Sequence, residues 1–295
     1  MKSTTFPWLN KKEYPFDAKY FSINGQSMHY IDEGAGAVLL FVHGTPSWSF
    51  DFRYQIKALS KHFRCIAIDH IGFGLSDKPA DYDYHTKNHA KTLAAFIQAL
   101  QLEQITMVMH DFGTIIGMDY ALKHPNNIHR LIIFNSWLWD CSERPEFIKS
   151  SKILRSPFLP FLYKRLNFSP RFLIPQSFAN RSKLTPSIHR HYRKVFSKAS
   201  ERNGPLAFAR SLLNDQAWFG ELWAKKEVLQ QKKMLFIWGM KDPFILAEYL
   251  DQFMTAYPKA KAVRLADCGH FPQEEEKEQV LEAMARFLIP TKVFA

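Results

Sequence analysis

The stretch ITMVMHDFGTIIG, residues 105–117, decides the fold of this chain. The apolar run over 105–109 ends at His110, and apolar residues resume after Gly113 at helical spacing. This pattern predicts a buried strand that turns sharply into a helix, with the carboxylate of Asp111 on the turn. A charged group at the end of a buried strand needs hydrogen-bond donors, which the first turn of a helix supplies. Asp111 is therefore either a helix cap or a reactive group.

Length and composition indicate a packed globular protein, because the chain has 295 residues of which 46% are hydrophobic. No apolar run is long enough to span a membrane, and the first residues contain no apolar signal segment. Cys65, Cys141 and Cys268 are widely spaced and form neither a metal-binding nor a disulfide pattern. These features predict a cytoplasmic protein without a metal site.

The net charge of +11 is concentrated in one segment. Residues 141–217 contain 15 Lys and Arg against 4 Asp and Glu, which leaves 24 residues of each sign in the rest of the chain. This contrast predicts an inserted module. We place it at residues 138–213, between the two parts of a core formed by residues 1–137 and 214–295.

Buried strands alternate with predicted helices along the chain. After a predicted hairpin over residues 19–32, the strands cover residues 37–42, 64–69, 105–109, 130–134, 234–238 and 261–265. This alternation predicts an α/β fold with a mostly parallel central sheet flanked by helices. Functional groups in such folds lie beyond the carboxyl ends of the strands. Asp111, Asp242 and His270 all follow strands, in that order along the chain.

The turns after these strands carry motifs that resemble those of the haloalkane dehalogenases and, more distantly, the epoxide hydrolases. The matching segments are MHYIDEG (28–34), HGTPSWSF (43–50), DHIGFGLSDKP (69–79), HDFG (110–113), GMKD (239–242) and CGHFPQEE (268–275). The resemblance implies an α/β-hydrolase fold in which the inserted module is a helical cap domain. It also implies no cofactor, a nucleophile at Asp111, a base at His270 and an orienting acid at Asp242. Asp267 is the local rival for the acid, although its place near His270 suits a turn.

Two positions depart from the dehalogenase pattern. Members of that family bind the leaving halide with two N–H donors. One is a Trp directly after the nucleophile, and the other is an Asn directly after His-Gly or a Trp from the cap. This chain has Phe112 and Thr45 at the first two positions and no Trp within residues 141–217. The backbone N–H groups of Phe112 and Thr45 still suit an oxyanion hole. Four further side chains are candidates for contacts with the substrate or leaving group: Trp137, Trp139, Tyr163 and Tyr192.

A carboxylate nucleophile restricts the chemistry. Attack on an ester carbonyl would give an anhydride, whereas attack on an sp³ carbon gives an alkyl ester that water can cleave. Because the chain resembles the haloalkane dehalogenases, we expect haloalkane dehalogenase-like hydrolysis of a small or lipophilic apolar substrate. Epoxide hydrolysis and β-lactone hydrolysis or decarboxylation are alternatives, because the halide donors are replaced. A receptor that binds a ligand without catalysis is a further alternative, which the complete set of catalytic residues disfavours.

The basic module contains no nucleic-acid-binding motif, so a nucleic-acid partner is not expected. Residues 156–179 mix phenylalanines with lysine and arginine. This mixture suits peripheral contact with an anionic membrane surface, or with a lipophilic acid. An exposed, solvated helical surface would have the same composition. For the chain itself we expect a monomer or a small homo-oligomer.

Overall fold

The computed structural model describes residues 6–289. Its centre is an eight-stranded sheet in the order β1-β2-β4-β3-β5-β6-β7-β8. The strands are β1 (Lys19–Ile23), β2 (Gln26–Glu33), β3 (Val38–Val42), β4 (Arg64–Ile68), β5 (Ile105–Met109), β6 (Ile128–Phe134), β7 (Lys233–Gly239) and β8 (Lys261–Leu265). Pairing is antiparallel between β1 and β2 and between β2 and β4, and parallel at every other junction. The mostly parallel sheet predicted from the sequence is confirmed.

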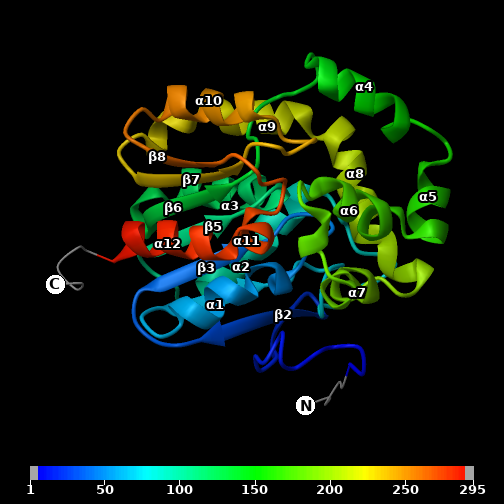
Figure 1. Cartoon of the computed structure of the whole chain (residues 1–295), viewed down its shortest axis with the longest axis horizontal. Helices are drawn as coiled ribbons and strands as arrows, with labels where there is room; N and C mark the ends of the chain where they lie inside the picture. Colours follow the sequence, from blue (N-terminus) through cyan, green and yellow to red (C-terminus); the bar gives the residue numbers. More distant parts are fainter. Residues whose placement is uncertain (1–5, 290–295) are drawn as a thin grey trace.

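Helices cover both faces of the sheet (Figure 1). Helices α1 (Arg53–Leu59) and α12 (Lys277–Leu288) contact each other on one face, and α2 (Thr86–Ala99) and α3 (Phe112–Lys123) contact each other on the other face. Every residue of β5 is buried, as expected for a central parallel strand covered on both sides. Helices α10 (Ala247–Ala256) and α11 (Pro272–Glu275) complete the core.

The predicted insert is helical and lies beyond one end of the sheet (Figure 1). It contains α4 (Pro145–Leu154), α5 (Leu159–Leu166), α6 (Ile174–Ser177), α7 (Pro186–Lys194) and α8 (Asn203–Asn214). Helix α9 (Gln216–Ala224) then contacts α3 and returns the chain to the core. We propose residues 138–213 as the cap domain on this basis. None of the helices in residues 6–289 combines the length and apolarity needed to cross a bilayer.

Asp111 occupies a strained turn between β5 and α3. Its backbone has φ 53° and ψ −131°, a conformation that non-glycine residues rarely adopt and that costs about 1–3 kcal/mol. Close packing holds the turn in place. A Cβ atom on Gly113 would lie 2.1 Å from the carbonyl oxygen of Val42, and one on Gly44 would lie 2.2 Å from Oδ1 of Asp111. Only glycine at both positions lets β3 approach the turn this closely.

Glycine on α3 also explains an irregular feature of the turn. The general elbow pattern has a small residue two positions before the nucleophile, where this chain has Met109. The facing residue on α3 is Gly117, and a Cβ atom there would lie 2.5 Å from the Met109 sulfur. In the general pattern a small residue on the strand makes room for the helix. Here Gly117 on the helix makes room for the Met109 side chain on the strand.

Replacing Gly113 by alanine should destabilise the protein far more than replacing Gly117 by alanine. The Gly113→Ala methyl group would collide with the backbone of β3, which we expect to cost at least about 3 kcal/mol. The neighbours of Gly117 are the flexible side chains of Met107 and Met109, which can move, and alanine gains about 1 kcal/mol in helix propensity. Thermal unfolding followed by circular dichroism measures both effects. Equal melting temperatures for the two variants would contradict this account of the turn.

Candidate active site

The three predicted catalytic side chains meet beyond the ends of β5, β7 and β8. Nδ1 of His270 lies 2.7 Å from Oδ2 of Asp242, and Nε2 of His270 lies 3.7 Å from Oδ2 of Asp111. Each of these three residues is at most 7% exposed. The rival acid, Asp267, has a side chain that is 84% exposed and lies 2.6 Å from Lys241. His270 therefore contacts Asp242 and not Asp267.

The surrounding carboxylates favour the protonated form of His270. Burial lowers the pKa of its imidazole, but Asp242, in direct contact, and then Asp111 and Asp51 raise it by more. The net result is a pKa of about 8, above the ordinary value of 6.5. Because the folded-state pKa exceeds the unfolded one, His270 stabilises the fold fully below pH 6.5. This contribution is lost as the pH rises through about 8.

Asp242 is fixed by donors from two strand ends. Its Oδ1 accepts from the backbone N–H groups of Phe244 (2.8 Å) and Ile245 (3.0 Å), and its Oδ2 also accepts from Nδ2 of Asn135 (2.9 Å). Asn135 is completely buried, and its side-chain oxygen accepts from the N–H of Gly239 at 2.8 Å. Asn135 was not among the site residues predicted from the sequence. Its position directly after a buried strand was the signal for this positioning role.

The predicted oxyanion-hole residues flank the carboxylate of Asp111. The backbone N–H of Thr45 donates to Oδ1 of Asp111 at 2.9 Å. Phe112 is the first residue of α3, so its N–H belongs to a helical turn that lacks intrahelical acceptors. The contact from Thr45 holds Oδ1 and leaves Oδ2 on the side facing His270.

Several buried polar groups have no hydrogen-bond partner among residues 6–289. Those near Asp111 include the hydroxyl of Thr45 and the indole N–H of Trp137. The Trp137 ring packs edge-on against the ring of Phe112, with centroids 4.9 Å apart, and Phe208 of α8 packs against Phe112 at the same separation. An unpaired buried donor costs about 1–3 kcal/mol, so such groups suggest a polar ligand.

The structure does not bring Trp139 or Tyr163 to this site, which corrects the predicted contacts. Trp139 packs against Trp223, Tyr249 and Phe253 at ring separations of 5.0–5.1 Å, on the side of α9 and α10. Tyr163 belongs to a separate apolar cluster that includes Leu206. Leu206 and Phe208 lie two positions apart on α8 and so point to nearly opposite faces of the helix, which places α8 between Tyr163 and Phe112.

The predicted contact of Tyr192 with a leaving group is also corrected, because its hydroxyl is engaged elsewhere. The oxygen lies 3.1 Å from Oδ1 of Asp51 and 3.0 Å from Oε2 of Glu274. Burial raises the pKa of Glu274 even though Arg53 pairs with it. Through these hydrogen bonds, Tyr192 connects helix α7 of the cap to the core, and all three residues are buried.

The side chain of His110 supports this region from the core. Its Nε2 lies 2.8 Å from the carbonyl oxygen of His270, and its Nδ1 lies 3.1 Å from Nε2 of Gln273. Gln273 in turn donates to Asp51 at 2.8 Å. His110 thus contacts the backbone of His270 and does not contact the carboxylate of Asp111. Its role is to hold the loop that carries the base.

Comparison with known proteins agrees with the fold. The family model described as alpha/beta hydrolase fold matches residues 37–277, and the chain belongs to that family. Its relatives include haloalkane dehalogenase 2 of Mycobacterium tuberculosis, to which it is 31% identical over 92% of this chain and 94% of the relative. The chain is thus a haloalkane dehalogenase-like hydrolase.

Two other comparisons bear on the fold and on the substrate question. The chain is also 31% identical to a cis-3-alkyl-4-alkyloxetan-2-one decarboxylase of Shewanella oneidensis, over 95% of this chain and 91% of the relative. Among solved structures, a variant of the haloalkane dehalogenase DatA from Agrobacterium tumefaciens superposes with a TM-score of 0.84. That match has 24% identity and covers 93% of this chain and 97% of the other.

Replacing Asp242 by asparagine should lower the pKa of His270 and nearly abolish turnover. Among the charges that raise the His270 pKa, Asp242 contributes most, so without it the pKa should fall from about 8. The wrong tautomer is then favoured, and the corresponding change in the serine proteases costs about 10⁴ in kcat. NMR titration of the imidazole and steady-state kinetics measure the two effects. Asp267→Asn is the control, and a larger loss in that variant would refute the assignment of the acid.

Proposed function

We propose that this chain hydrolyses an apolar substrate through a covalent alkyl ester on Asp111, with an anionic leaving group displaced from an sp³ carbon. The observation that carries the proposal is the geometry around one carboxylate. Oδ1 of Asp111 is held by the Thr45 N–H, while Oδ2 faces His270 from 3.7 Å. That distance exceeds a hydrogen bond, so the lone pairs of Oδ2 are available for attack.

The first step forms the ester. Oδ2 of Asp111 attacks the substrate carbon, and the bond to the leaving group breaks as that group takes the electron pair. In the second step, neutral His270 removes a proton from water, which attacks the ester carbonyl of Asp111. The N–H groups of Thr45 and Phe112 stabilise the resulting oxyanion. Collapse expels the alkoxide, which takes the proton from His270 and leaves as the alcohol. The carboxyl group left on Asp111 then releases the second proton of the water to the solvent, which restores the carboxylate.

Halide is the leaving group that kinship with the dehalogenases favours. A halide in a closed pocket needs donors, since a buried anion without them is costly. The chain lacks the Trp and Asn of the dehalogenase pattern, but the unpaired Trp137 indole and the Thr45 hydroxyl lie beside Phe112 and Asp111. We assign halide binding to this pair of donors.

Opening of a β-lactone is the second candidate, favoured by the equal similarity to the oxetanone decarboxylase and by the missing dehalogenase donors. Attack of Asp111 on the sp³ ring carbon breaks its bond to the ring oxygen and frees a carboxylate on the substrate. Loss of carbon dioxide then supplies the electron pair of a new C=C bond and expels Asp111 as a carboxylate. The two donors would meet the substrate carboxylate in the same place as a halide.

An epoxide is less well supported. Its leaving alkoxide remains on the substrate and needs a proton donor, a role that cap tyrosines fill in the epoxide hydrolases. Here the hydroxyl of Tyr192 is bonded to Asp51 and Glu274, and Tyr163 lies on the far side of α8 from Phe112. Halides and β-lactones need no such acid.

Substrate panels combined with a trapping variant test the proposed function. Wild type should release halide and alcohol from a series of bromoalkanes, or alkene and carbon dioxide from cis-disubstituted β-lactones. His270→Gln should form the ester with a bromoalkane but fail to hydrolyse it, giving an adduct that peptide mapping places on Asp111. An adduct on another residue, or full turnover by His270→Gln, would refute the mechanism.

Removing either donor should slow formation of the ester more than its hydrolysis. A hydrogen bond to a charged group contributes about 1.5–3 kcal/mol. Trp137→Phe and Thr45→Val should therefore each lower the rate of halide release in a single turnover by roughly one to two decades. The matched control is Trp139→Phe, since that indole is also buried and unpaired but packs against α9 and α10. Equal losses in Trp137→Phe and Trp139→Phe would show that packing and not anion binding is affected.

A further inference from the structure

The cap exposes most of the large apolar side chains found on the surface of residues 6–289. Nine such side chains are exposed in this part of the chain, and six of them fall within residues 145–172. The six are Ile148 (49% exposed), Ile153 (58%), Phe158 (70%), Phe161 (55%), Leu166 (37%) and Phe172 (42%). Scattered exposed apolar residues are ordinary, but a cluster of this kind marks an interaction surface.

The same segment is strongly basic and is not neutralised by the protein. It contains six cations, namely Lys149, Lys152, Arg155, Lys164, Arg165 and Arg171, and one acid, Glu146. The acid is turned toward the core, where it accepts a hydrogen bond from the Tyr249 hydroxyl at 2.7 Å. None of the six cations forms a salt bridge to a carboxylate within residues 6–289. The surface therefore carries uncompensated positive charge around its apolar side chains.

Helix α4 shows how little of this segment the protein itself covers. None of its ten residues is buried, and it lies at the outer edge of the molecule (Figure 1). Its apolar side chains at Ile148 and Ile153 are half exposed, with Lys149 and Lys152 beside them in the sequence. Packing against the rest of the protein therefore stabilises this helix little, and contact with an apolar environment outside the protein would stabilise it further.

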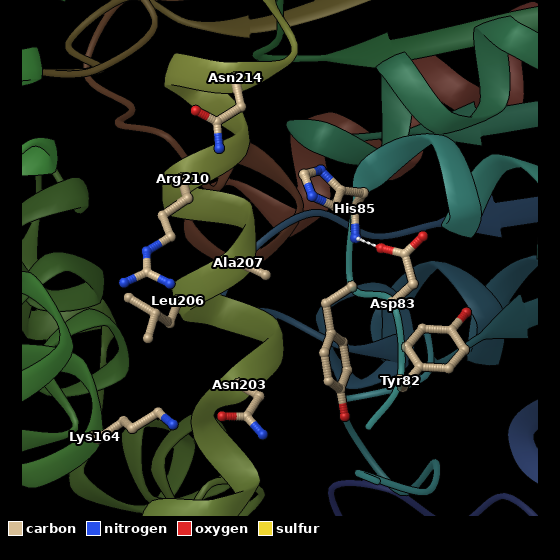
Figure 2. Close-up of a pocket in the computed structure, with 10 residues that line it drawn as sticks. Tyr82, Asp83, His85, Lys164, Asn203, Leu206, Ala207, Arg210 and Asn214 are labelled. Carbon is tan, nitrogen blue, oxygen red and sulfur yellow. Dashed lines mark hydrogen bonds between the residues drawn. The ribbon is translucent and has the colours of Figure 1, made fainter. Parts of the chain in front are cut away.

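Two grooves near this segment are lined in part by basic side chains. One, of about 370 Å³, is lined by Lys164, Arg210 and Leu206 together with residues 82–85. Figure 2 shows Lys164 of α5 on the same side of α8 as the side chains of Leu206 and Arg210. The other, of about 360 Å³, contains Arg155 and shares Arg210 with the first. Neither groove includes a predicted catalytic residue, so this basic surface is distinct from the site at Asp111.

We propose that residues 145–172 dock onto a bilayer that contains anionic phospholipids, with Phe158 and Phe161 entering the interface and the surrounding cations facing the headgroups. Charge complementarity selects this partner. Each Lys or Arg near an anionic membrane strengthens binding by roughly five-fold, and apolar side chains add burial in the acyl boundary. The inference does not depend on the chemistry proposed at Asp111, because binding is measured without turnover.

Vesicle sedimentation with the full-length chain tests the proposal. Wild type should bind vesicles of phosphatidylcholine mixed with phosphatidylglycerol, should bind pure phosphatidylcholine weakly, and should be released by high salt. Phe158→Ala combined with Phe161→Ala should weaken binding about ten-fold for each residue. The control pair, Tyr20→Ala with Val228→Ala, removes comparably exposed apolar side chains outside the segment and should leave binding unchanged.

Charge-reversal variants distinguish vesicle binding through residues 145–172 from a general attraction between the basic protein and anionic lipid. Reversing Lys149, Lys152 and Arg155 to glutamate should lower binding by about 100-fold or more. The control reverses Lys61, Lys91 and Lys225, which are exposed outside residues 145–172 and give the same change in net charge. Equal losses in the two triple variants would overturn the proposal, because binding would then follow net charge alone.

Two further results would overturn it. One is failure of wild type to bind either kind of vesicle. The other is a self-association of wild type, seen by sedimentation velocity, that the Phe158→Ala and Phe161→Ala pair abolishes, since the surface would then bind a second copy of the chain. Circular dichroism checks that every variant is folded. A Phe158→Trp variant adds a direct readout, with a blue shift of emission expected only when the anionic vesicles are present.

Discussion

The rest of the site depends on the turn at Asp111, which places a charged side chain between a buried strand and a buried helix. The backbone conformation there is unfavourable, and it persists because Gly44 and Gly113 let β3 and α3 close around it. The turn directs the carboxylate out of the core and presents Oδ1 to the N–H of Thr45. A relaxed turn would lose both the direction of the nucleophile and the donors of the oxyanion hole.

Hydrogen bonds between buried polar groups position the residues that surround this turn. Asn135 connects the ends of β6 and β7 and fixes Asp242, which fixes His270. Behind His270, Tyr192 of the cap contacts two buried carboxylates of the core. A buried network of this kind costs stability when any member is missing, so it favours one position of helix α7 relative to the core. The position of the cap and the orientation of the base are thereby coupled.

The sequence predicted the core well because its signals are local. Apolar runs ended by glycine and charged residues mark β3 to β8, and the Asn24-Gly25 pair marks the hairpin, where both residues have positive φ. Asp111, Asp242 and His270 could be predicted to lie close together because each follows a strand of the parallel sheet. Their proximity needed only the parallel sheet, since the carboxyl ends of parallel strands share one edge.

Contacts within the cap could not be predicted in the same way. Trp137 and Trp139 are two positions apart and chemically identical, yet one packs on Phe112 and the other on Tyr249. Which of them lies near the site depends on where α8 and α9 pack, and the spacing of apolar residues within one helix does not reveal its packing partner. Sequence spacing likewise does not reveal which side of α8 Tyr163 meets, or that the hydroxyl of Tyr192 is bonded to Asp51 and Glu274.

The central claim is that an oxygen of Asp111 is transferred to the product. A single turnover with enzyme in excess, in water enriched in the heavy oxygen isotope, tests it most directly on any haloalkane that the chain hydrolyses. The account predicts an alcohol that carries ordinary oxygen, and a heavier Asp111 peptide after proteolysis. Heavy oxygen in the alcohol of the first turnover, with an unchanged Asp111 peptide, would show direct attack by water and would contradict the account.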